Sequence, residues 1–291
     1  MQTLESEHLI CRVSPHGAEL QSLLLKANAE ELIWQGNPTV WSGRAPILFP
    51  IVGALRNLPK LHKKGAVMLP KHGFARTQRF QLIEQRDALA RYSLTSNAET
   101  LKLYPWHFEL QVCFELMSDR LAIHYEVRNK YESELLFNLG SHPAFRLPLE
   151  NSTLSDYSIQ FDQPENLELY SVTPEGLLDP SATKYALSSS RIELSETIFN
   201  NDALVFKNIN STHISLLHRS QGTRLSVATG SAPHIGIWAK PGAQFVCIEP
   251  WWGHADFSDA NSEFAQKSSI QSLLRGNVFS TSIEIRPSIA G

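Results

Sequence analysis

The 291-residue chain has few cysteines, a formal net charge of only −3 and no long apolar run. Cys11, Cys113 and Cys247 are odd in number, far apart and outside any Cys-x-x-Cys pair, which argues against a disulfide framework and against a thiolate zinc site. We expect three buried thiols that act as small apolar side chains. Lys and Arg number 26 against 29 Asp and Glu, so no net field favours nucleic acid or an anionic membrane. The expected partner is a small molecule.

We also expect no segment for export or membrane insertion. The N-terminus places Glu5, Glu7 and Arg12 among its apolar residues, unlike a secretory signal. The longest stretch of low charge, residues 45–55, is far shorter than the roughly 20 residues that cross a bilayer. We therefore expect a soluble, cytoplasmic protein. The sequence contains no Gly-x-Gly-x-x-Gly, Walker-type, His-Glu-x-x-His or Gly-x-Ser-x-Gly motif, which argues against the common nucleotide-binding, metalloprotease and serine-hydrolase classes.

Apolar and polar residues alternate over much of the chain, which predicts β-strands. Residues 108–116 and 121–127 alternate on either side of a Ser118-Asp119 turn, the pattern of an antiparallel hairpin with one buried face. Other predicted strands are 8–13, 80–84, 90–94, 135–139, 157–161, 214–217, 225–228, 235–238, 245–248 and 281–285. Short helices are predicted only at 97–103 and 268–274. No linker or repeat marks a boundary, so we expect one all-β domain, residues 1–291, with its site on a concave sheet face.

Two segments place polar residues at the ends of predicted strands. Glu249 follows four apolar residues, and it is either paired for structure or aimed at a ligand. Trp251, two residues later, favours the wall of a ligand-binding site. Burial of Glu249 by indole rings would raise its pKa towards the range of a general base. His142 ends an apolar run and is held in extended geometry by Pro143. Such a histidine is either structural or catalytic.

Two further segments place polar residues on loops. His72 and Arg76 flank Phe74 in a Gly-containing loop, which suits an oxygen-rich ligand or is simply a solvated turn. Arg56 is the first clearly polar residue after an apolar run, and taken alone this pattern favours a surface residue over a binding residue. His254 and Asp256, two residues apart, are a weak signal for a metal. We expect neither a metal nor a cofactor.

These segments occur in an order that resembles the aldose 1-epimerase (galactose mutarotase) superfamily, most closely its LacX-like branch. The motifs are LFPIVGALRN at 48–57, KHGFAR at 71–76, FNLGSHPAF at 137–145, NDALVF at 201–206 and FVCIEPWWGHAD at 245–256. The likeness covers nearly the whole chain. It implies an antiparallel β-supersandwich whose concave face binds an aldohexose without a cofactor. It leaves open whether the protein is a monomer or a homodimer.

The resemblance also implies roles for individual residues. Glu249 corresponds to the general base that takes the proton from the anomeric hydroxyl, and His142 to the general acid that protonates the ring oxygen. His72 corresponds to a second histidine that assists at the ring oxygen or positions the sugar. Arg56 and Asp202 correspond to residues that bind sugar hydroxyls.

The sequence departs from the galactose-specific branch at several of these positions. Phe74 stands where that branch has a second glycine, and Pro250 and Trp251 follow Glu249 where that branch has a Glu-Thr-Gln sequence around its base. Ala203 replaces the histidine that usually follows the family aspartate. Phe74 and Trp251 would offer apolar faces to the sugar. The His-Gly-Phe-Ala-Arg string is shared with hexose-6-phosphate epimerases, so Arg76 and Lys71 could hold a phosphate. A phosphosugar epimerase, a sugar-binding protein without turnover and a structural docking domain therefore remain alternatives.

Overall fold

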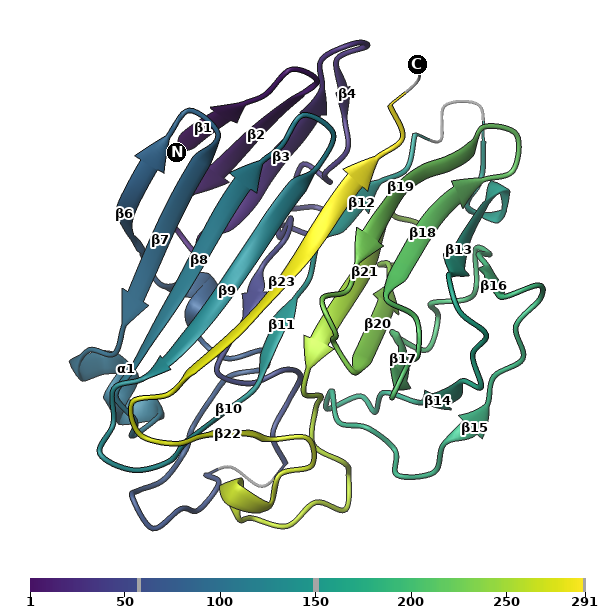
Figure 1. Ribbon diagram of the computed structural model, residues 1–291. Helices are drawn as coiled ribbons and strands as arrows, with labels where there is room; N and C mark the ends of the chain where they lie inside the picture. The colour runs from purple at the N-terminus through teal and green to yellow at the C-terminus, as the bar shows by residue number, and fades with distance from the viewer. Residues whose placement is uncertain (57–58, 149–151, 290–291) are drawn as a thin grey trace.

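The computed structural model describes residues 1–56, 59–148 and 152–289, and its strands pair in antiparallel fashion into two large and two small sheets (Figure 1). The predicted all-β, antiparallel class is thus confirmed. In Figure 1 the larger sheet lies in front, with the yellow strand β23 crossing the middle of the molecule. The expectation of a single domain stays a prediction.

The nine-stranded sheet contains the predicted hairpin. Its strands in spatial order are β16 (Arg191–Glu193), β13 (Tyr157–Phe161), β18 (His213–His218), β19 (Gly222–Ala228), β23 (Val278–Pro287), β9 (Leu121–Asn129), β8 (Phe108–Leu116), β7 (Leu89–Thr95) and β6 (Gln81–Arg86). Leu116 pairs with Leu121, and Phe108 with Asn129, so the hairpin closes at the predicted turn. Leu110 and Val112 alternate into the core because one face of the hairpin is buried.

The eight-stranded sheet is centred on β21 (Phe245–Trp252), a strand that is buried along its whole length. Its order is β15 (Thr183–Lys184), β14 (Glu168–Tyr170), β17 (Leu204–Lys207), β20 (His234–Trp238), β21, β11 (Leu139–Ser141) and β5 (Ile47–Leu48), while β12 (Ala144–Arg146) also pairs with β21. Because both faces of β21 are covered, polar side chains on this strand are placed inside the protein.

The remaining elements are short. A four-stranded sheet consists of β1 (Gln2–Glu5), β2 (Leu9–Ser14), β3 (Glu19–Leu25) and β4 (Glu30–Glu31), and β10 (Leu135–Phe137) pairs with β22 (Gln271–Leu273). The helical pieces are α1 (Ala98–Leu103), η1 (Ala75–Thr77), η2 (Leu154–Asp156) and η3 (Phe264–Gln266). Helix α1 confirms the helix predicted at 97–103, and the side chain of its N-cap residue Asn97 accepts from the backbone N–H of Thr100.

The helix predicted at 268–274 is wrong. Residues 271–273 form β22 instead, and Leu273 pairs with Leu135 of β10. The Asn129 side chain donates a hydrogen bond to the Leu273 carbonyl at 2.7 Å, which holds this segment extended. Contacts with distant parts of the chain therefore override its weak helical pattern.

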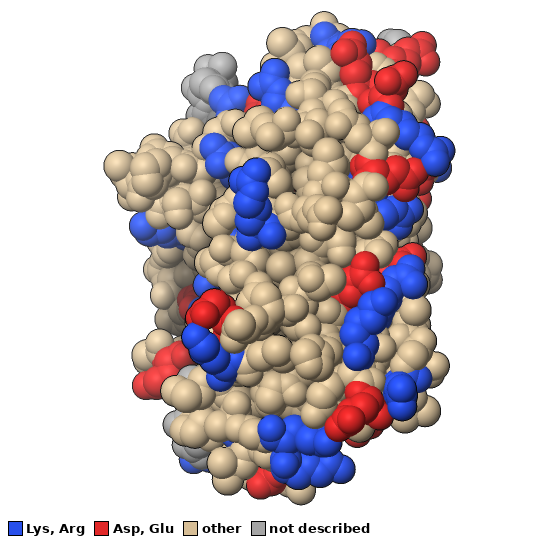
Figure 2. Space-filling view, turned by 90° about the vertical axis from the view of Figure 1, so that its left-hand side faces the viewer, with Lys and Arg blue, Asp and Glu red and all other residues tan. Residues whose placement is uncertain are grey.

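The apolar core contains side chains from both large sheets, among them Phe108 and Tyr125 of the nine-stranded sheet and Ile248 of β21. The three cysteines are buried and form no disulfide, as predicted. On the face shown in Figure 2, positive and negative side chains alternate along the right-hand edge.

Among the described residues, no helix is both long enough and apolar enough to span a bilayer.

Candidate active site

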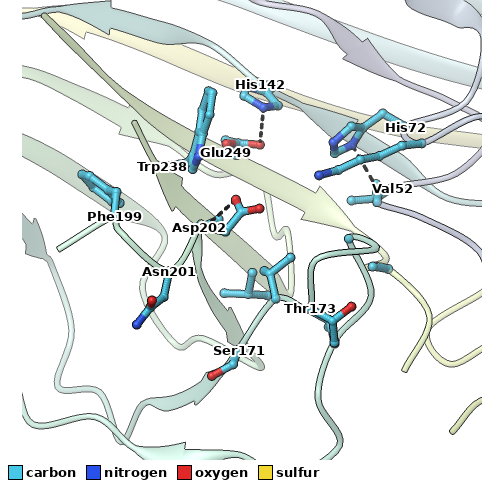
Figure 3. A pocket seen from close by; sticks show the side chains of 18 of the residues that line it. Val52, His72, His142, Ser171, Thr173, Phe199, Asn201, Asp202, Trp238 and Glu249 are labelled. Atoms are coloured by element: carbon cyan, nitrogen blue, oxygen red, sulfur yellow. Dashed lines mark hydrogen bonds and ion pairs between the residues drawn. The ribbon is translucent and has the colours of Figure 1, made fainter. Parts of the chain in front are cut away.

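A cavity of about 960 Å³ lies over the strands at the centre of the eight-stranded sheet. Its lining residues come from parts of the chain that are far apart in sequence and that fall within 41–53, 71–76, 171–178, 199–205 and 238–255, together with His142. Figure 3 shows their side chains converging from strands and from the loops around them. A cavity of this size is sufficient for a small ligand.

The floor of the cavity is made by alternate residues of β21. Glu249 and Trp251 share one face of this strand, with Gly236 of β20 opposite Glu249 and Gly140 of β11 opposite Trp251. A Cβ atom on Gly236 would lie 2.5 Å from Cζ2 of Trp251, and one on Gly140 would lie 2.8 Å from its Cδ1. The two glycines therefore leave the space in which the Trp251 indole lies on the sheet.

The structure brings Glu249 and His142 together. Oε2 of Glu249 is 3.2 Å from Nε2 of His142, the dashed contact at the top of Figure 3. Both residues are buried, Glu249 with 1% and His142 with 8% of its surface exposed. The His142 ring stacks on Trp41 at 5.2 Å and meets the edge of Trp238 at 5.8 Å between ring centroids. These indoles hold the imidazole against the carboxyl group.

Burial shifts both members of this pair towards their uncharged forms. It raises the pKa of Glu249 well above its usual value, while the Trp251 side chain and the Lys71 ammonium act in the opposite direction. It lowers the pKa of His142 to about 3, and the positive charges of Arg76 and Lys71 add to this effect. In the absence of a ligand these shifts favour the uncharged pair, in which the Glu249 carboxyl carries the proton and the His142 imidazole is neutral.

His72 is held as a hydrogen-bond donor. The backbone N–H of Gly53 donates to Nδ1 of His72 at 3.1 Å, and the backbone N–H of His72 donates to the Gly53 carbonyl at 2.8 Å. Because Nδ1 accepts, the proton of the neutral ring is on Nε2. Burial, His142 and the cations of the same loop lower the pKa of His72 well below its usual value. Gly73 has φ +70°, and its Cβ would lie 2.2 Å from the Phe49 carbonyl oxygen, so the turn requires glycine.

The rim of the cavity carries both signs of charge. Lys71 and Arg76 line one side, and Arg76 donates a hydrogen bond to the Lys71 carbonyl at 3.0 Å. Asp202 lies before β17, with its carboxylate directed towards Glu249 in Figure 3 and accepting from the Ala203 N–H at 2.8 Å. The residues that were predicted from the sequence and that line the cavity are Lys71, His72, Arg76, His142, Asp202, Glu249 and Trp251.

Two predicted residues lie elsewhere. The ring of Phe74 is buried in the aromatic core, 5.9 Å from Phe108 and 6.3 Å from Tyr104 between centroids. The Arg56 guanidinium donates to the Ala260 carbonyl. Neither is among the described residues that line the cavity, so neither side chain offers a surface to a ligand there. Phe74 is the N-cap residue of η1 and belongs to the apolar core instead.

Several lining residues were missed by sequence reasoning. Trp238 ends a predicted strand, and its pairing with Cys247 places it on the same sheet face as Glu249. That placement could have been inferred had the order of the strands been known. Phe199, Asn201 and Thr173 lie in irregular segments, where no periodic pattern indicates which way a side chain points.

Asp256, the other half of the weak metal signal, has protein partners. Its Oδ2 is 2.7 Å from Nζ of Lys60 and accepts from the Arg56 N–H at 2.9 Å, while Oδ1 is 3.5 Å from Nζ of Lys267. All three charged side chains are fully or almost fully buried. Nδ1 of His254 is 2.7 Å from the Ala255 carbonyl oxygen, so neither residue of the pair presents a free ligand set.

This buried ion triad of Lys60, Asp256 and Lys267 is linked to the cavity wall. The Asp256 N–H donates to the Ala54 carbonyl at 2.9 Å, and Ala255 packs so closely on Gly53 that a Cβ there would lie 2.3 Å from its methyl group. Gly53 is the residue whose backbone N–H donates to the His72 ring. The ion triad therefore supports the loop that orients His72.

A different group of residues could hold a metal ion. The ligand atoms of His142, Cys247 and Glu249 lie within 4.8 Å of one another.

Comparison with known proteins agrees with this architecture. Residues 1–273 match the family described as aldose 1-epimerase, and the chain belongs to this family. It is 32% identical to Protein LacX (plasmid) of Lactococcus lactis subsp. lactis over 260 residues, which cover 86% of this chain and 87% of that protein. The resemblance found in the sequence is confirmed.

Solved structures of similar proteins share the fold. A galactose mutarotase related enzyme from Lactobacillus acidophilus superposes with a TM-score of 0.94 at 32% identity, covering 99% of this chain and 97% of that one. A galactose mutarotase-like protein from Lactobacillus casei ATCC 334 gives 0.91 at 26% identity, covering 98% and 99%. The galactose mutarotase-like β-sandwich is therefore the fold of this chain.

Proposed function

We propose that the protein is an aldose 1-epimerase, which interconverts the α and β anomers of an aldohexose by acid–base ring opening and closure. The observation that carries this proposal is the 3.2 Å approach of the Glu249 carboxyl and the His142 imidazole at the floor of the cavity. A proton acceptor and a proton donor on one face of a sugar are what the reaction requires.

In the proposed reaction, Glu249 takes the proton of the O1 hydroxyl while protonated His142 gives a proton to the ring oxygen O5. The C1–O5 bond breaks, O1 becomes the carbonyl oxygen, and the open chain turns about the C1–C2 bond. On closure O5 adds to the other face of C1 and returns its proton to His142, and O1 recovers its proton from Glu249. Every proton removed is replaced, so the reaction consumes no co-reactant.

The surroundings of the pair support these roles. The uncharged pair and the ion pair differ only in which partner holds the single proton, and sugar hydroxyls that donate to the carboxylate favour the ion pair. His72 donates from Nε2 because Nδ1 accepts from Gly53, so it suits the ring oxygen or a neighbouring hydroxyl. Trp251 offers its ring face to the C–H edges of the sugar.

NMR exchange between the two anomers of glucose and galactose, with polarimetry on fresh α-anomers, tests the proposal. Glu249→Gln should lower kcat by about 10² to 10⁴, the usual contribution of one positioned acid or base. Glu193→Gln, which changes an exposed carboxylate at the sheet edge, is the matched control and should leave kcat unchanged. Equal rates for the wild-type protein and Glu249→Gln on every sugar would remove the catalytic assignment.

A hexose 6-phosphate is the second candidate substrate, because Lys71 and Arg76 line the same cavity. If the phosphate is bound there, Arg76→Gln should raise KM for glucose 6-phosphate and leave KM for glucose unchanged. Tight calorimetric binding of a sugar without anomeric exchange would instead favour a binding protein without turnover. A cytoplasmic location and a monomeric or homodimeric state stay predictions.

A further inference from the structure

We propose that His142, Cys247 and Glu249 form an inhibitory site for a divalent cation of the zinc class. One ligand atom from each residue lies within 4.8 Å of the other two, and all three side chains are buried. The inhibition rests on the proposed epimerase function, whereas the binding of the cation does not. Cys247 has no role in the proposed reaction, so its place beside the acid–base pair is a separate observation.

The strand geometry explains why the thiol meets the pair. Cys247 precedes Glu249 by two positions on β21, so both side chains emerge on the same face. Cys247 pairs with Ala144 of β12, two positions after His142, and the small alanine side chain leaves the thiol close to the imidazole. Cys247 is completely buried and forms no disulfide.

The pair also contains buried polar atoms that have no hydrogen-bond partner. Among the described residues, Nδ1 of His142 and Oε2 of Glu249 lack one, although Oε2 lies 3.2 Å from the other ring nitrogen. Buried polar atoms are normally paired, so unpaired ones in a cavity point to a ligand. A cation that takes up a ring nitrogen and the carboxylate would pair both residues.

The donor set selects the kind of cation. One thiolate, one imidazole and one carboxylate suit zinc and similar borderline metals, and they do not suit magnesium or calcium, which prefer oxygen ligands alone. Tetrahedral zinc–ligand bonds of about 2.0 to 2.3 Å place donor atoms about 3.3 to 3.8 Å apart. The ligand atoms of the three residues lie within 4.8 Å of one another, so a shift of about 1 Å on binding would give that spacing. His142 and Glu249 line the cavity, from which a water molecule would supply the fourth ligand.

The charges balance in the bound form. The Cys247 thiol, and the Glu249 carboxyl when it carries a proton, release their protons to solvent on binding, and the two anions neutralise the dication. The bound cation occupies the carboxylate and imidazole lone pairs on which the proposed proton transfers depend. The cation is therefore an inhibitor and not a cofactor.

Cobalt(II) tests the site without any assay of activity. Titration of the chelator-treated protein with Co²⁺ should give one site with a near-ultraviolet thiolate-to-cobalt charge-transfer band. Cys247→Ala and Cys247→Ser should lose the band and bind Zn²⁺ about tenfold or more weakly by calorimetry. Cys113→Ala, which removes a buried thiol on β8, is the matched control and should keep both. The absence of the band, or equal Zn²⁺ affinity with and without Cys247, overturns the proposal.

Inhibition is measured separately. Zn²⁺ should abolish anomeric exchange by the wild-type protein, and a chelator should restore it. Cys247→Ala should keep the basal exchange rate and require about ten times more Zn²⁺ for the same inhibition. Equal inhibition of the two proteins overturns the site. If no sugar is exchanged, the proposed function fails, and the cobalt spectrum still decides whether the cation binds.

Discussion

Replacing Asp256 by asparagine should destabilise the protein strongly. Asparagine keeps the shape of the side chain and can still accept from the Arg56 N–H, but it leaves the Lys60 and Lys267 ammonium groups buried without their anion. Removing one partner of a buried ion pair typically costs about 3 to 5 kcal/mol. The distances of 2.7 and 3.5 Å to the two lysines place this site among the close pairs.

Lys267 limits the size of this effect. Burial lowers its pKa to about 8, so it can lose its proton at a cost of about 1 kcal/mol near neutral pH. We therefore expect a loss near 3 kcal/mol at pH 7, or about 6 °C in melting temperature for a chain of this size. Addition of Lys60→Met to Asp256→Asn should restore part of this loss, because it removes one unpaired charge.

Urea unfolding at pH 7 measures these free energies. Asp259→Asn is the matched control, since it changes an exposed carboxylate on the same segment and should shift the free energy of unfolding by less than about 0.5 kcal/mol. A loss below about 1 kcal/mol for Asp256→Asn would refute the reasoning.

Two further predictions concern stability. Gly236→Ala should lower the free energy of unfolding by about 1 to 3 kcal/mol, because the added methyl group would lie 2.5 Å from the Trp251 ring. Adding Trp251→Leu should recover part of this loss. An unchanged urea midpoint for Gly236→Ala would contradict the prediction. For Lys267, the folded pKa of about 8 lies below its ordinary value of 10.5, so the unfolded chain binds more protons between these pH values and stability rises with pH there. The free energy of unfolding of the wild-type protein, minus that of Lys267→Met, should rise by about 3 kcal/mol from pH 8 to 10.5. If this difference stays constant over that range, the prediction is wrong.

The strands of the nine-stranded sheet could be predicted because their local pattern is strong. Residues 108–116 and 121–127 alternate apolar and polar side chains, and the structure has strands at Phe108–Leu116 and Leu121–Asn129. Short strands such as β5 and β12 could not be predicted, since two or three residues carry no periodic signal. Their existence depends on pairing with β11 and β21, which is known only from the complete fold.

The floor of the site was more predictable than its walls. Glu249 stands out in the sequence because a carboxylate follows four apolar residues, and β21 places it as the strand pattern suggests. Arg56 and Phe74 belong to motifs of the family, yet their side chains are used by the Ala260 carbonyl and by the aromatic core. A motif identifies the position of a residue in the chain, whereas the direction of a loop side chain depends on packing that the sequence does not display.

Two buried carboxyl groups, Glu249 on β21 and Asp256 four residues after its end, show how the fold separates stability from chemistry. Asp256 is surrounded by two ammonium groups and a backbone N–H, so its charge is compensated within the protein. Glu249 faces a cavity, has an imidazole at 3.2 Å and leaves Oε2 without a hydrogen-bond partner among the described residues. A carboxyl group buried in this way costs stability, and burial raises its pKa. Such a position is explained by a ligand that completes its hydrogen bonds, which is the requirement of a general base that acts on a sugar hydroxyl.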